Sequence, residues 1–352
     1  MESQPRELLG LTAKDLCRYF ESLGESSFHG RQLFRSLYKN HRFQFDQLTD
    51  LSVALRETLK KRASITLPRL HSCQLSVDGT KKYLLSLADG QRVEAVFIPE
   101  QRRNTLCIST QVGCPMACQF CLTATLGLER NLGAGEIVGQ ILFAQGDRAD
   151  SLQPEAKPLN IVLMGMGEPL LNLENVAKAL SLMSDPTGLA IPAHRITLST
   201  VGLIPQLRQL AQVEVVPNLA ISLSATTDEV RDRLMPVNRK YPIRDLIECC
   251  VQFPLGSKQK ITFEYVLIDG VNDSLSDARR LVKLLSKLRS KVNLLPLNPG
   301  LKNGMRPSSP EQISKFREVL NAKGLPNYMR RPRGADIFAA CGQLHLASGK
   351  NA

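Results

Sequence analysis

The sequence has no tryptophan, and only 5% of its 352 residues are aromatic. So few rings argue against a platform of the RRM type, which stacks RNA bases on aromatic side chains. No stretch approaches the roughly 18 uncharged apolar residues of a membrane helix, and the N-terminus, MESQPRELLG, lacks the apolar run of a signal peptide. The five histidines are scattered without metal-ligand spacing. These absences predict a globular, cytoplasmic protein with no membrane segment.

Acidic residues are also in short supply, since 45 Lys and Arg residues face 33 Asp and Glu residues and leave a net charge of +12. Such a surplus indicates a polyanionic partner, although charge alone does not distinguish RNA from DNA or binding from catalysis. The nine cysteines are an odd number and cannot all pair. In a cytosolic chain they are better interpreted as reduced thiols, metal ligands or catalytic groups than as a disulfide framework.

The first 100 residues contain two patterns. Residues 1–70 carry apolar side chains at a helical period and predict a small helical domain. The expected helices run from Thr12 to Leu23, from His29 to Tyr38 and from Phe45 to Arg62. Residues 71–100 alternate in short segments around two Asp-Gly turns, Asp78-Gly79 and Asp89-Gly90, which predicts a β-hairpin or meander.

Residues 101–345 contain six short β-rich runs, each followed by a helical stretch; the runs are TLCIS, NIVLM, RITLS, NLAISL, KITFEYVLI and VNLLPL. Six such units indicate an α/β fold with a parallel sheet, either doubly wound or curved into an incomplete barrel. Active sites of these folds collect at the C-terminal ends of the strands. The cysteine-bearing and polar peptides follow these runs, so one mouth of the fold is predicted to be functional. Residues 346–352 are expected to form a tail.

The strongest motif is Cys114-x-x-x-Cys118-x-x-Cys121. Zinc is one interpretation, but a closed structural zinc site needs four ligands and no second cysteine pair lies nearby. A four-iron cluster normally takes four thiolates, so three thiolates leave one iron open. S-adenosylmethionine (SAM) can chelate an open iron through its amine and carboxylate, and an electron from the cluster would cleave it to a 5'-deoxyadenosyl radical. Three unrelated buried thiols are the alternative, but free thiols have no reason to share one loop.

The next run ends in Gly165-Met166-Gly167-Glu168-Pro169. A glycine-rich turn exposes the backbone at Gly167 and the carboxylate of Glu168, and both can bind an ammonium such as the methionyl amine. Alternatively, the motif is merely a strand-to-helix turn. Polar residues at equivalent strand ends could bind the ribose and carboxylate of SAM, although serine and asparagine also cap helices and make turns. They are Ser199, Ser222, Ser224 and Asn298.

Longer stretches carry a family resemblance. CISTQVGCPMACQFC, GLERNLGAGEIVGQI, LMGMGEPLLN, ITLSTVGLIP, LMPVNRKYPI, LLPLNP and RRPRGADIFAACGQL cover nearly the whole chain and resemble the RlmN and Cfr family of radical SAM RNA methyltransferases, RlmN most closely. The N-terminal pieces LGLTAKDLCRYFESLGESSFHGRQLF and FDQLTDLS resemble its helical RNA-binding accessory domain. The resemblance implies a partial (β/α)6 radical SAM barrel with a short β extension, a [4Fe-4S] cluster and SAM. The chain departs from the family at Ser224, where a histidine is frequent.

The resemblance also implies a mechanism. Cys341 and Cys107 match the family's two mechanistic cysteines, although by position alone each would be a packing thiol. One SAM molecule methylates Cys341, and the radical from a second converts this methyl group to a methylene radical that adds to the adenine. Attack by Cys107 on the Cys341 sulfur then releases methylated RNA and leaves a disulfide. Glu94 matches a glutamate proposed as the proton acceptor; alternatively, it is a solvated strand carboxylate.

The substrates implied by the resemblance are 23S rRNA, methylated at C2 of an adenine in the peptidyl transferase centre, and the tRNA adenine beside the anticodon. The resemblance also implies an electron donor such as reduced flavodoxin. It does not imply DNA as a partner. Three arginines before the Cys341 loop are predicted to contact RNA phosphates, unless they are a solvated charge run. They are Arg330, Arg331 and Arg333.

Three alternatives stay open on sequence grounds. A Cfr-type enzyme would share these motifs and methylate C8 of the same adenosine. An iron-sulfur electron carrier or a zinc-dependent RNA-binding module would also be basic and rich in cysteine. Neither of these two needs the GMGEP turn or Cys341.

Overall fold

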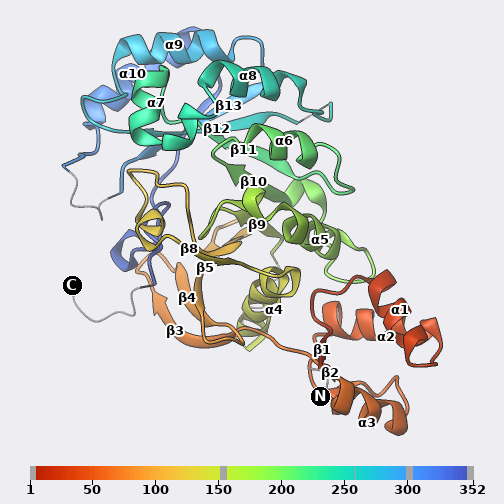
Figure 1. Ribbon diagram of the computed structural model, residues 1–352. Helices are drawn as coiled ribbons and strands as arrows, with labels where there is room; N and C mark the ends of the chain where they lie inside the picture. The colour runs from red at the N-terminus through yellow and green to blue at the C-terminus, as the bar shows by residue number, and fades with distance from the viewer. Residues whose placement is uncertain (1–4, 151–156, 258, 299–303, 347–352) are drawn as a thin grey trace.

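A computed structural model describes residues 5–150, 157–257, 259–298 and 304–346. The helical part at the N-terminus lies beside a large curved sheet, whose helices lie on its outer side (Figure 1). Apart from Leu346, the tail predicted over 346–352 falls outside the described residues. No helix within these ranges combines the length and the apolar character needed to cross a membrane.

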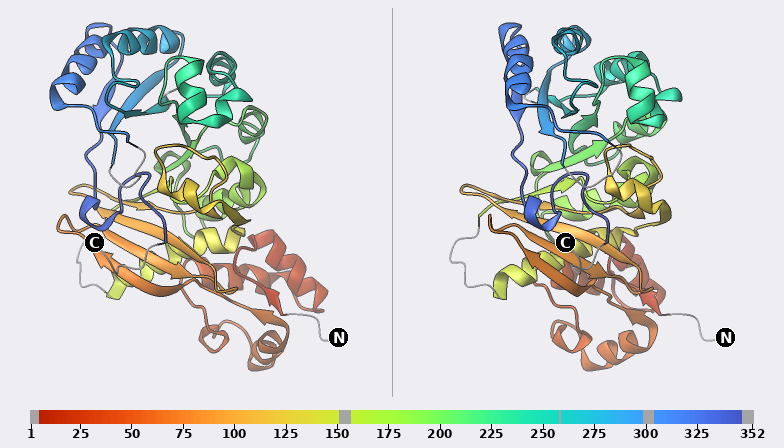
Figure 2. Two further views of the ribbon diagram at one scale, coloured as in Figure 1. Left: turned by 60° about the vertical axis from the view of Figure 1, so that its left-hand side comes forward. Right: turned by 90° about the vertical axis from the view of Figure 1, so that its left-hand side faces the viewer.

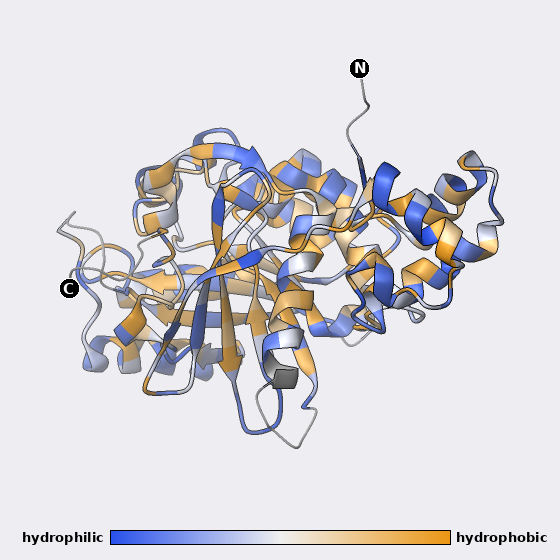
Figure 3. Ribbon diagram, turned by 90° about the horizontal axis from the view of Figure 1, so that it is seen from below, coloured by the Kyte–Doolittle hydropathy of each residue, from blue (hydrophilic) through white to orange (hydrophobic). Residues whose placement is uncertain are grey.

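The N-terminal helices form a helical module of α1 (Ala13–Ser22), α2 (Ser27–Tyr38) and α3 (Val53–Arg62). Each helix has a hydroxyl N-cap, from Thr12, Ser26 or Ser52, which accepts a hydrogen bond from a backbone N–H of the first turn. Short strands β1 (Arg6–Glu7) and β2 (Ala63–Ser64) pair in parallel and bring the two ends of the module together. Each helix of the module carries both hydrophilic and hydrophobic residues, as Figure 3 shows.

The helix predicted from Phe45 to Arg62 is wrong in extent. A short 3-10 helix, η1 (Phe45–Gln47), precedes a turn, and α3 begins only at Val53. The Ser52 hydroxyl accepts from the N–H of Leu55 and starts a new helix, because Ser satisfies an otherwise unpaired donor there.

A ten-stranded sheet forms the centre of the molecule, in the order β14-β13-β12-β11-β10-β9-β6-β5-β4-β3. Its parallel strands are β6 (Asn104–Cys107), β9 (Leu159–Leu163), β10 (Ile196–Thr200), β11 (Asn218–Ser222), β12 (Ile261–Leu267), β13 (Ser290–Pro296) and β14 (Asn327–Met329). The first six of these overlap the six predicted runs, each of which extends one or two residues beyond its strand. Figures 1 and 2 show the sheet curving with helices on its outer face, which is the incomplete-barrel arrangement.

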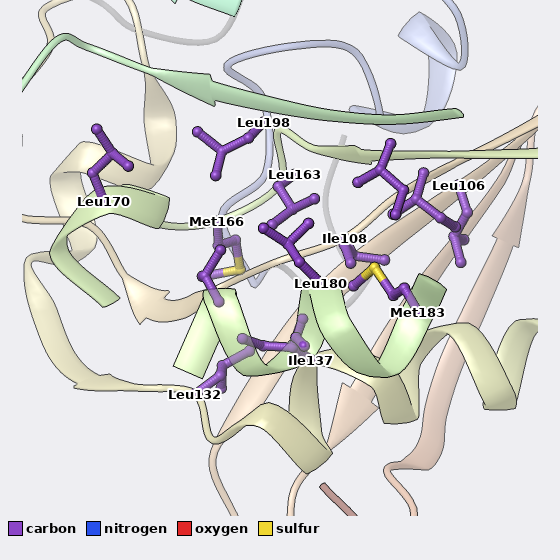
Figure 4. Packing of buried hydrophobic residues seen from close by; sticks show 14 of the residues in the cluster. Leu106, Ile108, Leu132, Ile137, Leu163, Met166, Leu170, Leu180, Met183 and Leu198 are labelled. Atoms are coloured by element: carbon purple, nitrogen blue, oxygen red, sulfur yellow. The ribbon is translucent and has the colours of Figure 1, made fainter. Parts of the chain in front are cut away.

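Within the described residues, one outer helix follows each parallel strand except β14, and two helices follow β11. The outer helices are α4 (Ala134–Asp150), α5 (Leu173–Ser184), α6 (Ile204–Leu210), α7 (Asp228–Leu234), α8 (Ile243–Gln252), α9 (Leu275–Leu285) and α10 (Pro310–Ala322). Figure 4 shows the core between the sheet and the first two of these helices. There Leu163 and Leu198 of the sheet pack with Ile137 of α4 and with Leu180 and Met183 of α5, all 0–1% exposed. Each such side chain contributes about 1.5–3 kcal/mol of burial free energy, which fixes the strand ends in place.

Strands β3 (Arg69–Leu75), β4 (Lys81–Ser86) and β5 (Arg92–Pro99) form an antiparallel meander, called here the β extension. Strand β5 pairs with β6, and Val96 lies opposite Cys107. The sheet therefore continues from the extension into the barrel without a break. A domain boundary at residue 100 stays a prediction.

Candidate active site

The loop that follows β6 carries the three-cysteine motif. It begins at β7 (Gln111–Gly113), which pairs with β8 (Leu128–Asn131). Gly113 has a φ of +79°, and a side chain there would collide with the Gly127 carbonyl. The Gly127 carbonyl also accepts from the N–H of Cys114 at 2.6 Å, and the N–H of Gln119 donates to Leu234 at the end of α7 at 2.9 Å. The cysteine loop is thus held at its base and against the barrel wall.

The three cysteines and every predicted SAM-binding residue surround one cavity of about 170 Å³, called here the cofactor cavity. Cys341 of the C-terminal segment also borders it. The residues that sequence reasoning singled out and that line it are Cys114, Cys118, Cys121, Gly167, Glu168, Ser199, Ser222, Ser224, Asn298 and Cys341. The fold brings these residues together from widely separated parts of the chain.

The donor set suits an iron-sulfur cluster. Cys118 is buried while Cys114 and Cys121 are half-buried, and burial raises the pKa of the Cys114 thiol to about 12. Among the described residues, no three His, Cys, Asp or Glu side chains converge closely enough to bind one metal ion. The thiols border a wider space instead, and three thiolates around a four-iron cluster would leave one iron for a non-protein ligand.

Glu168 supplies a buried carboxylate to the same cavity. Its side chain accepts from the N–H groups of Leu170 at 3.0 Å and Val201 at 2.9 Å. Burial raises the pKa of Glu168 to about 7, and these two hydrogen bonds act against the rise. Gly167, with a φ of +104°, lies against Gln111 where a side chain would not fit. A ligand ammonium beside this carboxylate would favour its ionised form.

Two further predicted SAM ligands already have protein contacts. Ser224 is buried with a φ of +50°, which is unusual for a residue with a side chain, and its hydroxyl accepts from the N–H of Val266 at 3.3 Å. Its carbonyl accepts from Asn272 at 2.7 Å. Asn298 donates to the Cys341 carbonyl at 3.0 Å. Asn298 therefore contacts the segment that carries Cys341, which the sequence did not indicate.

Residues 334–345 form the Cys341 loop, which lies across the cysteine loop. The N–H of Leu122 donates to Gly342 at 2.7 Å, and the Thr123 hydroxyl donates to Leu344 at 2.7 Å. Cys341 borders both the cofactor cavity and a smaller neighbouring cavity of about 70 Å³, which Cys107 also lines. Both thiols are free. The structure thus places the two cysteines around one space.

The environment of both thiols disfavours their ionised forms. Burial raises the pKa of Cys107, and a neighbouring charge on Cys341 would raise it further. Cys341 is exposed as a residue, but burial of its thiol group also raises the pKa of that thiol.

Glu94 lies behind the Cys341 loop rather than at either cavity. It is fully buried, so it is not a solvated carboxylate, and its Oε1 lies 3.2 Å from Nζ of Lys82. Its Oε2 accepts from the N–H of His345 at 2.9 Å, while Lys82 donates to the Phe338 carbonyl at 3.3 Å. The ion pair therefore holds the Cys341 loop at Phe338 and at its end, His345. Sequence reasoning missed Lys82, since only pairing of β4 with β5 brings it to Glu94.

The arginine cluster of Arg330, Arg331 and Arg333 lines a third cavity, of about 940 Å³, on the inner side of the barrel. Four further basic residues line this large cavity, and they are Arg103, Lys157, Arg195 and Lys291. Met164 and Glu264 border both this cavity and the cofactor cavity. Arg333 is partly engaged, since it donates to the Pro99 carbonyl at 2.8 Å.

Polar strand residues give the large cavity an unusual lining for a barrel interior. Strands β6, β9, β10, β11 and β13 contribute Thr105, Asn160, Thr197, Asn218 and Asn293. Barrel interiors are ordinarily filled by bulky apolar side chains. Asn160, Asn218 and Asn293 lie inside the apolar runs NIVLM, NLAISL and VNLLPL. A polar residue within such a run was the feature of the sequence that could have indicated a polar ligand.

Comparisons with known proteins agree with this arrangement. Residues 6–65 match the family described as ribosomal RNA large subunit methyltransferase N-terminal domain, and residues 108–285 match the radical SAM superfamily. A dual-specificity RNA methyltransferase RlmN of Geobacter sulfurreducens is 48% identical, covering 96% of this chain and 91% of the relative. The RlmN of Geotalea uraniireducens is 46% identical and covers 96% of both chains. A crystal structure of a radical SAM methyltransferase from Sphaerobacter thermophilus is 40% identical, with a TM-score of 0.91 over 97% of this chain and 99% of that one.

Proposed function

The chain belongs to the RlmN family of radical SAM RNA methyltransferases, and from this premise we propose that it methylates C2 of an adenine in 23S rRNA and of the adenine beside the tRNA anticodon. Membership confirms the predicted resemblance, the radical SAM α/β fold and the methyltransferase class. It excludes an electron carrier or a zinc module as the chain's identity. The proposed location is the cytoplasm.

The radical SAM family uses a [4Fe-4S] cluster and SAM, and the cofactor cavity has suitable donors for both. When bound, they supply a methyl group and, after one-electron reductive cleavage of SAM, a radical that abstracts hydrogen. We propose that Cys114, Cys118 and Cys121 hold the cluster. Gly167 and Glu168 would meet the methionyl amine. The ribose and carboxylate would be bound by Ser199, Ser222, Ser224 and Asn298.

Cys341 is proposed to carry the transferred carbon. Its thiolate accepts a methyl group by displacement, and the same carbon, after loss of a hydrogen atom, becomes bonded to C2 of the adenine. This adduct loses the C2 proton and one electron, and that electron would pass to the cluster, which was oxidised when SAM was cleaved. Sγ of Cys107 then bonds to Sγ of Cys341, the bond from that sulfur to carbon breaks, and the carbon takes up a proton to complete the methyl group. A dithiol reductant must reduce the disulfide before the next turnover.

The observation that carries this proposal is the position of Cys341, which borders the cofactor cavity on one side and the cavity of Cys107 on the other. A cysteine there can meet a methyl donor and a second thiol without leaving its loop. Proton acceptance by Glu94 stays a prediction, and its contacts with Lys82 and His345 support a positioning role.

RNA is proposed to enter through the large cavity. Its seven basic residues include the arginine cluster, and they can neutralise backbone phosphates. Its polar strand residues can hydrogen-bond the edges of an unstacked base. Met164 and Glu264 would then flank the passage to Cys341. Reduced flavodoxin is the proposed electron donor.

Mass spectrometry of rRNA from a deletion strain tests substrate and regiochemistry together. The expected result is loss of 2-methyladenosine, restored by the wild-type gene and not by a Cys341→Ala gene. Loss of 8-methyladenosine instead would assign the Cfr-type reaction. Unchanged rRNA would refute the rRNA substrate, and tRNA from the same strain tests the second substrate independently.

A further inference from the structure

Arg231 is a buried cation beside the cofactor cavity. It lies on α7 with 0% of its surface exposed. Its guanidinium donates to the carbonyls of Leu223 at 3.2 Å, Ser222 at 3.1 Å and Val201 at 2.7 Å. A fourth hydrogen bond reaches Oδ1 of Asn238 at 3.0 Å. All four acceptors are neutral groups, although a buried arginine is usually paired with a carboxylate.

The carbonyls that Arg231 binds belong to the wall of the cofactor cavity. Val201 follows β10 and Ser222 ends β11, and both residues line that cavity. Both backbone groups of Val201 are held, since its N–H donates to Glu168 and its carbonyl accepts from Arg231. Arg231 therefore fixes two neighbouring strand ends relative to the Glu168 carboxylate.

The cysteine loop docks on the same helix, one turn further along. The N–H of Gln119 donates to Leu234, and the N–H of Met235 donates to the Arg231 carbonyl at 2.7 Å. Burial lowers the pKa of Arg231 to about 10, which leaves it charged at neutral pH, and the neighbouring Cys118 thiolate opposes this decrease. Asp228 and Asp232 also contribute negative charge, but their carboxylates accept from the Asn238 amide.

We propose that Arg231 is a positioning residue and the counter-cation of the iron-sulfur cluster, which orders the SAM-binding strand ends and raises the cluster's reduction potential. A four-iron cluster held by three thiolates carries a net negative charge that grows when it accepts an electron. A buried positive charge nearby stabilises the reduced form more than the oxidised form, because low-dielectric surroundings screen it weakly. This inference rests on the proposed function of the cofactor cavity.

The test is an EPR-monitored redox titration with dithionite of the full chain, reconstituted anaerobically with iron and sulfide. Arg231→Met removes the charge and is expected to move the midpoint potential to a more negative value. Arg231→Lys keeps the charge and is expected to stay close to wild type. Arg233→Met, an exposed arginine on the same helix, is the control and should not change the potential. If Arg231→Met does not assemble a cluster, Arg231→Gln replaces it, since Gln keeps hydrogen-bond donors without charge.

SAM affinity, measured by calorimetry on the same proteins, tests the positioning role. Lysine cannot bridge Val201 and Ser222 as the guanidinium does, so Arg231→Lys should weaken SAM binding roughly tenfold, which corresponds to about one lost hydrogen bond. An unchanged potential in the uncharged variant, or an equal change in the lysine variant, would overturn the counter-cation role. A wild-type chain that assembles no cluster would instead refute the proposed function.

Discussion

The buried pair of Lys82 and Glu94 allows a quantitative prediction. The two charges lie 3.2 Å apart, and their side chains are 4% and 1% exposed. At an effective dielectric constant near 20 their attraction is about 5 kcal/mol, while desolvation of each ion costs several kcal/mol. The pair as a whole therefore contributes little net stability. Removal of one partner is different, because the other charge stays buried without compensation, and Lys82→Met should destabilise the fold by about 3–5 kcal/mol.

Urea unfolding of four proteins measures this coupling: wild type, Lys82→Met, Glu94→Gln and the double variant. The double variant should lose clearly less free energy of unfolding than the sum of the single losses. Lys81→Met is the matched control, since Lys81 pairs with Asp147 at 2.7 Å but both side chains are 28% exposed. It should cost about 1 kcal/mol or less. The reasoning is refuted if Lys82→Met costs no more than this control, or if the two single losses simply add.

Three more predictions concern chemistry. Burial raises the pKa of Glu168 to about 7, and its ionised form is proposed to bind the methionyl amine, so SAM affinity should fall as the pH decreases through 7. Glu168→Gln should remove this dependence and weaken binding roughly tenfold or more at pH 8, measured by calorimetry. A pH-independent affinity in wild type would contradict this role. Cys107→Ala should accumulate a covalent protein-RNA adduct on denaturing gels and Cys341→Ala should not; an adduct from the Cys341 variant would reverse the assignment. The slope of the logarithm of the RNA-binding constant against the logarithm of the salt concentration should become about one unit shallower for each phosphate contact that an Arg→Gln change in the arginine cluster removes. An unchanged slope would mean that the arginine serves the protein's own packing.

Local patterns predicted the strands and most helices of the barrel correctly. The six β-rich runs became β6 and β9 to β13 because their alternation with helices leaves few ways to bury both. Strand β14 was not predicted, since three residues give no usable pattern. The helix expected from Phe45 was broken because a single hydroxyl cap at Ser52 outweighs a continuous apolar period.

The candidate site was predictable only in part. The cysteine spacing and the glycine-rich turn are local signals, and Cys107 and Cys341 were singled out by resemblance. Lys82 and Arg231 were missed, because a buried charge has no signature in sequence and its partners are chosen by tertiary packing. Seven basic residues around the large cavity were likewise invisible as a group, since they come from β strands and loops far apart in the chain.

The contacts between the β extension and the Cys341 loop have a consequence for synthesis of the protein. The contacts from Ser76 to Asp336, Lys82 to Phe338 and Glu94 to His345 join residues 251 to 260 positions apart. Closing a loop of that length costs about 5 kcal/mol in chain entropy. The three contacts close the same loop, so together they offset this one cost. During translation the β extension follows the helical module and leaves the ribosome long before the Cys341 loop. Until that loop is made, Lys82 lacks its contact with Phe338 and Glu94 lacks its contact with His345. Cys341, the proposed carrier of the methyl group, is therefore translated after all the strands of the barrel, and its loop docks on a β extension that has already been made.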